Sequence, residues 1–397
     1  MIKACSTGEE GIIAVPYNCC SLHIRIMGLV YDEAQLRDIS TRFHIYGQIL
    51  HAEPCKIGHI NETYTATYEQ GGNEVRYVHQ KINGKVFTKP LEVMDNVDRV
   101  TRHIHQKLVA AEETDITRKV LILIPSRDGN CFYQDDEGHY WRTYVYVENI
   151  RTYESVESTR QALEAGRAFG LFVQQLSDLP SPALHETIVD FHNVRKRFDA
   201  FVRALEKDRI NRAKHIPREI QFFLKHEPII RKLEKALASG RLPVRTTHND
   251  TKFNNVLLDA HTQKQCCVVD LDTVMPGTLL YDFGDMVRTT TSPTMEDERD
   301  LSKVRMRMPM FKALARGYLE ATAGMMTRTE KKLIAFSGKL MTYTIGLRFL
   351  TDFLQGDTYF RVHRPLHNLD RSRTQIKLAQ SIERQEEKMQ AYVESLG

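Results

Sequence analysis

The chain has 397 residues, of which 42% are hydrophobic and 27% are charged, a composition typical of a globular protein with a buried core. This length allows one large two-lobed unit or two domains. The formal net charge of +4 is too small to indicate a nucleic-acid-binding protein, because the most basic stretch, residues 193–218, carries apolar side chains at the spacing of an amphipathic helix.

Cysteine usage and hydropathy bear on the cellular compartment. The seven cysteines include the adjacent pairs Cys19–Cys20 and Cys266–Cys267 but no C-x-x-C pair, so neither a zinc ribbon nor a disulfide framework is indicated. The sequence contains no apolar run long enough to span a membrane and no charged-then-apolar signal peptide. We therefore expect a cytoplasmic protein that has neither a membrane nor a nucleic acid as partner.

Residues 1–38 differ in character from the rest of the chain. Their sequence has no clear period and contains three cysteines. We interpret them as an uncertain extension, disordered or mis-assigned, because Met27 serves equally well as a start and a short helix is predicted only from about Asp32.

Residues 39–150 have the pattern of a small β-rich lobe. The segment 62–69 alternates apolar and polar residues, the turn signal QGGNE follows it, and a second alternating run continues to about residue 82. An amphipathic helix is predicted after Pro90, and further strands are predicted in residues 118–126 and 142–150. Together these elements predict an antiparallel sheet with one helix.

Residues 151–397 are dominated by helical patterns. The first is STRQALEAGRAFGLFVQQLSDL, and another begins at Thr327, where Glu330 completes the spacing of a capping box. The predicted fold class is therefore α+β, with a β-rich lobe at 39–150 and a larger helical lobe at 151–397 that share a cleft.

The most informative motif is THNDTKFNN, which places His248, Asp250 and Asn255 close together. Downstream, Asp270 and Asp272 interrupt the apolar run CCVVDLDTV. Burying unpaired carboxylates is costly, so a positive group is expected beside these two. A carboxylate that orients a hydroxyl, together with an amide and a second carboxylate that hold Mg²⁺, is the set of groups that phosphoryl transfer requires.

Other catalytic motifs are absent from the sequence. It contains no G-x-x-x-x-G-K-[ST], no G-x-G-x-x-G and no H-E-x-x-H. The remaining pattern, H-x-D-x-x-x-x-N followed by an Asp, resembles the catalytic loop and metal-binding Asp of protein-kinase-like enzymes. It is most similar to the aminoglycoside-phosphotransferase and choline-kinase family, and within that family to the N-acetylhexosamine 1-kinases. The resemblance covers roughly residues 45–365, in the blocks KIGHINETY, QKINGKVFTKPLEVMDNV, IVDFHNVRKRF, THNDTKFNNVL, VVDLDTVMPGTLLYDFGDMVR and GLRFLTDFLQGDTYF.

The resemblance implies a role for each residue of the motif. Asp250 would be the catalytic base, and His248 would order the loop through hydrogen bonds. Asn255 and Asp270 would ligate Mg²⁺. Asp272 would support the metal directly or through water; the alternative is a strand-end carboxylate held by backbone amides.

The resemblance also implies an ATP site. The strand lysine that binds phosphate would be Lys81, with Glu92 as a positional guess for its partner, whereas a solvated edge lysine is the alternative. Adenine would meet the backbone of residues 143–149. The turn over the phosphates would contribute Gly58, Asn61 and Thr63.

For the sugar, the resemblance implies contacts from Arg348 and Tyr359. The alternatives are an i, i+4 ion pair between Arg348 and Asp352, and simple packing of Tyr359 beneath its loop. A tryptophan that contacts the sugar in the family has no counterpart here, since the single tryptophan is Trp141, in the other lobe.

The expected function is ATP- and Mg²⁺-dependent phosphorylation of the anomeric hydroxyl of N-acetylglucosamine or N-acetylgalactosamine. The first alternative is the same chemistry on choline, an aminoglycoside or homoserine. The second is a non-catalytic nucleotide-binding regulator, against which the intact Asp250, Asn255 and Asp270 speak. The sequence does not indicate an oligomeric state.

Overall fold

The alternating segments of the first third form the predicted antiparallel sheet. The structure, a computed structural model, describes residues 33–55 and 60–396. Its strands follow the order β1-β2-β3-β6-β4, with β5 on β6, and all pairs are antiparallel. The strand bounds are β1 Gln48–Pro54, β2 Glu62–Gln70, β3 Asn73–Lys81, β4 Leu123–Ile124, β5 Tyr133–Gln134 and β6 Tyr140–Val145.

Two helices cover the small lobe. The predicted helix after Lys89 is α2, Pro90–Ala110, whose apolar stripe is buried. The second, α1 (Glu33–Thr41), was not part of the predicted lobe. Its Leu36 and Ile39 are buried in one cluster with Tyr64 and Trp141 of the sheet. Helix α1 therefore packs on the sheet of the small lobe, although its first part falls within residues 1–38, which the sequence predicts as an extension.

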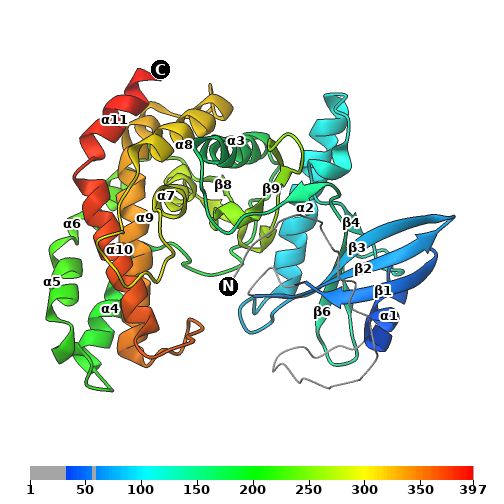
Figure 1. The fold of residues 1–397 in the computed structure, drawn as a ribbon, viewed down its shortest axis with the longest axis horizontal. Helices are drawn as coiled ribbons and strands as arrows, with labels where there is room; N and C mark the ends of the chain where they lie inside the picture. Colours follow the sequence, from blue (N-terminus) through cyan, green and yellow to red (C-terminus); the bar gives the residue numbers. More distant parts are fainter. Residues whose placement is uncertain (1–32, 56–59, 397) are drawn as a thin grey trace, which may run out of the picture.

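The large lobe is helical, as the sequence predicts, and Figure 1 shows it as a group of long helices beside the sheet lobe. The capping box of Thr327 and Glu330 is formed at the start of α9, and Ser158 with Gln161 forms another at the start of α3. The helices are α3 Thr159–Gln175, α4 Val194–Lys207, α5 Pro217–Lys225, α6 Pro228–Ala238, α7 Leu279–Thr291, α8 Met308–Ala321, α9 Arg328–Gln355, α10 His367–Glu383 and α11 Glu386–Ser395.

Two small sheets lie on the cleft side of the large lobe and carry the motif residues. One has the order β10-β9-β7, with β7 Ile150–Arg151, β9 Val256–Asp259 and β10 Gln265–Val268. The other pairs β8 (Arg245–Thr247) with β11 (Met275–Gly277). The THNDTKFNN motif links β8 to β9, and Asp270 follows β10 directly. No helix within the two described ranges combines the length and apolar character that crossing a membrane requires.

Helices α3 and α8 cross at very short range, because glycines lie at the crossing. A Cβ on Gly166 would come within 2.2 Å of the Leu314 carbonyl oxygen, and one on Gly317 within 2.1 Å of the Leu163 carbonyl oxygen. This crossing supports the catalytic loop, since Phe169 and Phe172 of α3 pack against it.

We predict that Gly166→Ala destabilises the protein by about 1–3 kcal/mol, the usual cost of overpacking a filled site. Thermal or urea unfolding measures the loss. Gly84→Ala is the matched control, because a Cβ there meets nothing within 4 Å. Equal stability of the two variants would contradict the close crossing.

Candidate active site

His248 orders the start of the catalytic loop. Its ring is fully buried, with the edges of Phe169 and Phe172 at centroid distances of 5.2 and 5.6 Å. Nε2 lies 3.0 Å from the Val269 carbonyl oxygen, and the backbone N–H of Asp250 lies 3.3 Å from Nδ1. A carbonyl only accepts, so Nε2 carries the proton and Nδ1 accepts. These are the contacts that the predicted loop-ordering role requires.

Asp282 of α7 fixes the backbone of the same loop through hydrogen bonds. Its carboxylate accepts the backbone N–H groups of His248 at 2.9 Å and Asn249 at 2.7 Å, while its carbonyl accepts the Thr251 hydroxyl at 2.7 Å. Burial raises the pKa of Asp282 to about 6 against the lowering effect of these partners. Asn249 has a φ of 65°, a left-handed conformation that such contacts can maintain. Asp282 therefore braces the loop.

Asp250 faces a lysine that the sequence analysis missed. The Lys252 ammonium lies 3.0 Å from the Asp250 carboxylate, and both side chains line the cleft between the lobes. Burial by itself would raise the pKa of Asp250, but Lys252 outweighs it and holds this pKa below its ordinary value. Lys252 is 45% exposed, so its charge is open to a ligand in the cleft. The sequence feature that could have identified Lys252 is its position two residues after Asp250 within the THNDTKFNN motif.

Asn255 and Asp270 offer oxygen atoms at the same end of the cleft. Asn255 donates its Nδ2 to the Asp250 carbonyl oxygen at 2.9 Å, which leaves Oδ1 for another partner. Asp270 has a φ of 61° and precedes the turn Leu271–Thr273. Within the described residues its carboxylate has no hydrogen-bond or ion-pair partner.

The electrostatics of Asp270 fit a cation. Its side chain is open to solvent in the cleft but is surrounded by the cleft walls, which partly desolvate the carboxylate. This desolvation and the negative charges of Asp272 and Asp250 raise the pKa of Asp270 to about 7. A divalent cation would relieve that repulsion. No group of three His, Cys, Asp or Glu side chains in the described parts of the chain could hold a metal by itself. Mg²⁺ in phosphotransferase sites typically uses one or two carboxylates plus substrate phosphates, so Asn255 and Asp270 fit it.

The Asp272 carboxylate interacts with two side chains of the small lobe. Its carboxylate lies 2.5 Å from Nη1 of Arg142, which comes from β6 of the small lobe, and both side chains are only 1% exposed. Asn61 donates its Nδ2 to the other oxygen at 2.5 Å. These contacts favour a supporting role for Asp272 over direct metal ligation.

The prediction for Lys81 does not agree with the structure. Side chains alternate along β3, and Val78 and Gln80 line the cleft, whereas Lys81 forms an ion pair with Glu62 at 3.3 Å. Glu92 is not its partner, because Glu92 pairs with Lys89 at 2.9 Å.

The buried cation on the small-lobe wall of the cleft is Arg142 rather than Lys81. It donates Nε and Nη2 to the Gln80 side-chain oxygen at 2.8 and 2.5 Å. Within its strand, nothing in the sequence distinguishes it from a surface arginine.

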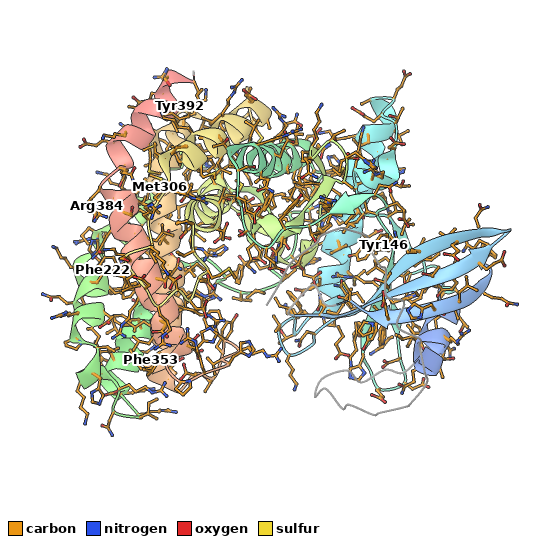
Figure 2. The ribbon with its side chains drawn as sticks, in the orientation of Figure 1. Tyr146, Phe222, Met306, Phe353, Arg384 and Tyr392 are labelled. Carbon is orange, nitrogen blue, oxygen red and sulfur yellow. The ribbon has the colours of Figure 1, made fainter. Side chains whose placement is uncertain are left out.

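The cleft as a whole has a volume of about 250 Å³ and is lined by both lobes. Asn61 and Thr63 line it as predicted, whereas Gly58 lies outside the described residues. Tyr146, labelled in Figure 2 between the lobes, belongs to the segment where adenine is expected. Its ring lies 4.0 Å from the Arg76 guanidinium, and its N–H donates to the Arg76 carbonyl at 3.0 Å.

The expected sugar residues lie together on the large-lobe side. Arg348 of α9 donates Nη2 to the Tyr359 hydroxyl at 3.4 Å. Its guanidinium carbon is 5.1–5.7 Å from the ring centroids of Phe191, Tyr359 and Phe360. The alternative ion pair with Asp352 is wrong, because that carboxylate accepts three backbone N–H groups of residues 358–360.

Two further aromatic side chains are buried and hydrogen-bonded. His192 is buried, donates Nε2 to the Asn249 carbonyl oxygen at 2.8 Å, and has its pKa lowered to about 4 by burial, which agrees with a structural histidine. Trp141 is buried in the small lobe and donates to Asp135 at 2.8 Å, so it does not take the place of the family tryptophan.

Solved structures with this fold include phosphotransferases of several kinds. A microcompartment-associated aminopropanol kinase has a TM-score of 0.53 at 14% identity, covering 90% of this chain and 98% of its own. An aminoglycoside phosphotransferase from Alicyclobacillus acidocaldarius has a TM-score of 0.54 at 12% identity, covering 95% and 98%. A spectinomycin phosphotransferase, solved with ADP and spectinomycin, has a TM-score of 0.55 at 12% identity, covering 88% and 98%.

At these identities the similarity shows the fold, which is the predicted two-lobed α+β architecture. Sequence comparison shows more. The family model described as the phosphotransferase enzyme family matches residues 51–322, which is more than half of the chain and includes the catalytic loop and Asp270. This protein therefore belongs to the phosphotransferase enzyme family.

Proposed function

We propose that this protein is an ATP- and Mg²⁺-dependent kinase that phosphorylates the anomeric hydroxyl of an N-acetylhexosamine. The observation that carries the kinase part is the meeting of Asp250, Lys252, Asn255 and Asp270 at one end of the cleft. The same four groups speak against a non-catalytic regulator, which has no need of a base beside a metal site. We place the activity in the cytoplasm, where ATP is abundant and free thiols persist.

In the proposed reaction, the acceptor hydroxyl oxygen attacks the γ-phosphorus of ATP and the bond from that phosphorus to the β,γ-bridging oxygen breaks. Asp250 accepts the hydroxyl proton, and ADP leaves. The Lys252 ammonium stabilises charge on the transferred phosphoryl group, which needs positioning and neutralisation more than covalent help. Bound Mg²⁺, held by Asn255 and Asp270, would supply further charge neutralisation between the phosphates.

The acceptor class rests on the large-lobe residues. The blocks around Arg348 and Tyr359 resemble those of N-acetylhexosamine kinases, and a guanidinium can donate to sugar hydroxyl or acetamido oxygens. Choline recognition uses an aromatic cage for its cation. Here the three rings surround a cation that belongs to the protein itself, which disfavours choline.

We predict that Asp250→Ala lowers kcat by about 10²–10⁴, the usual range for a positioned base. ADP binding and the melting temperature should change little, because Asp250 is not part of a core. Steady-state turnover with a fixed acceptor measures the effect. Near-normal turnover would show that another group accepts the proton.

Asp270→Asn and Asp272→Asn should differ in kind. The first replaces a charged carboxylate ligand by a neutral amide, so the Mg²⁺ concentration for half-maximal rate should rise while stability stays close to that of the wild type. The second leaves Arg142 buried without its partner, so it should lower the free energy of unfolding by about 3–5 kcal/mol. Magnesium titrations and urea unfolding of both variants separate the roles. Identical metal dependence of wild type and Asp270→Asn would remove Asp270 from the site.

The acceptor assignment predicts a product without a reducing end. ADP release is measured against N-acetylglucosamine, N-acetylgalactosamine, choline, homoserine and an aminoglycoside. Phosphate on C1 removes the reducing end of the sugar, whereas phosphate on O6 preserves it. A reducing product, or turnover of another acceptor only, would leave a phosphotransferase of a different specificity.

A further inference from the structure

A second arginine, Arg197, lies close enough to Arg348 for the charge of Arg348 to affect it. Arg197 of α4 donates Nε and Nη2 to the Phe191 carbonyl oxygen at 3.3 and 3.1 Å. The ring of the same Phe191 lies 5.1 Å from the guanidinium carbon of Arg348. Two guanidinium groups thus contact one residue from two elements. Burial and, to a smaller extent, the charge of Arg348 together lower the pKa of Arg197 to about 10.

The positive charge of this pair is not balanced by nearby carboxylates. Asp250 and Asp285 affect the electrostatics of this region, but Asp250 is paired with Lys252 at 3.0 Å and Asp285 with Arg288 at 2.8 Å. Asp190 is paired with Lys196 at 2.7 Å. Among the described residues, neither Arg197 nor Arg348 forms an ion pair with a carboxylate.

Arg348 is also held in place. Asp352, one turn further along α9 and only 2% exposed, accepts the backbone N–H groups of Thr358, Tyr359 and Phe360 at 2.8–2.9 Å. The Asn368 amide donates to the same carboxylate at 2.8 Å. These bonds keep two of the three rings against the guanidinium.

The loop is fastened a second time at its start. Arg212 donates to the Phe353 carbonyl oxygen at 2.7 Å and to Asp357 at 2.6 Å. Figure 2 shows Phe353 at the end of α9 from which this loop leaves. Swinging Arg348 away from an unsuitable ligand would therefore break up its aromatic surroundings.

We propose that Arg197 and Arg348 make the acceptor site reject any acceptor that carries an ammonium group, so that a hexosamine is accepted only with its nitrogen acylated. This inference rests on the proposed function and specifies its substrate class. A partly desolvated ammonium near two guanidiniums is strongly disfavoured, whereas an amide or hydroxyl oxygen accepts their hydrogen bonds. The reaction that acylates the amine must then precede phosphorylation.

The test compares each amine with its N-acetyl derivative. Wild-type kcat/KM is measured for glucosamine against N-acetylglucosamine and for galactosamine against N-acetylgalactosamine. We expect the free amines to be poorer by about tenfold or more near neutral pH. The difference should shrink as rising pH deprotonates the substrate amine while both arginines stay charged. An amine used as well as its amide would overturn the proposal.

Variants connect the discrimination to charge. Arg348→Met removes the charge and should reduce the difference in kcat/KM between each amine and its N-acetyl derivative. Arg348→Lys keeps the charge and should preserve that difference. Arg316→Ala is the control, because this exposed residue of α8 forms a surface ion pair with Glu320, its one ion-pair partner among the residues that the structure describes. If Arg348→Met and Arg348→Lys give the same ratio, charge is not the cause and the proposal fails.

Failure of the sugar assignment can be distinguished from failure of this inference. If no hexosamine reacts, the proposed function is wrong, but ethanolamine against N-acetylethanolamine still tests charge exclusion. Calorimetry of the same pairs with ADP and Mg²⁺ present gives the comparison without turnover. Tighter binding of an amine than of its amide in any pair would overturn charge exclusion whatever the acceptor is.

Discussion

The buried ion pair between Arg142 and Asp272 joins the two lobes at the point where nucleotide and metal are expected to meet. One partner comes from β6 of the small sheet, between β3 and β4, and the other follows the expected metal ligand, Asp270. A buried pair of this kind costs desolvation and is worth keeping only when its geometry is well satisfied. Gln80 and Asn61 complete its hydrogen bonds. The pair thereby fixes the position of the small-lobe sheet relative to Asp270.

The catalytic loop is built by the same means, from buried polar contacts that leave its working groups free. The Asp282 carboxylate accepts the backbone N–H of His248, and the His248 ring donates to the Val269 carbonyl oxygen. Asp250 and Lys252 line the cleft. Such an arrangement spends little free energy on reorganisation when charge develops, which is the main source of catalytic power in polar sites. The left-handed backbone at Asn249 is consistent with a loop held by its surroundings rather than by its own preference.

On the expected acceptor side, a buried carboxylate fixes a loop by accepting hydrogen bonds from its backbone N–H groups. Asp352 collects the N–H groups of the loop after α9, and this places Tyr359 beside Arg348. Three aromatic rings around a guanidinium give it a fixed direction and a partly dry environment. Both properties sharpen selection by charge, because electrostatic interactions weaken in a mobile or well-hydrated site.

Features that depend on neighbours along the chain can be predicted from the amino-acid sequence. The alternating and helical patterns, the capping box at Thr327 and the loop H-x-D-x-x-x-x-N followed by Asp270 all rest on local spacing, and the structure contains each of them. Which side chains face the cleft depends instead on how distant strands and the two lobes pack together. A shift of one residue along a strand exchanges its faces, so pairing of β3 with β6 selected Gln80 over Lys81. Likewise, Asn61 and Asp272 are 211 residues apart, and no local pattern signals a contact that packing of the two lobes creates.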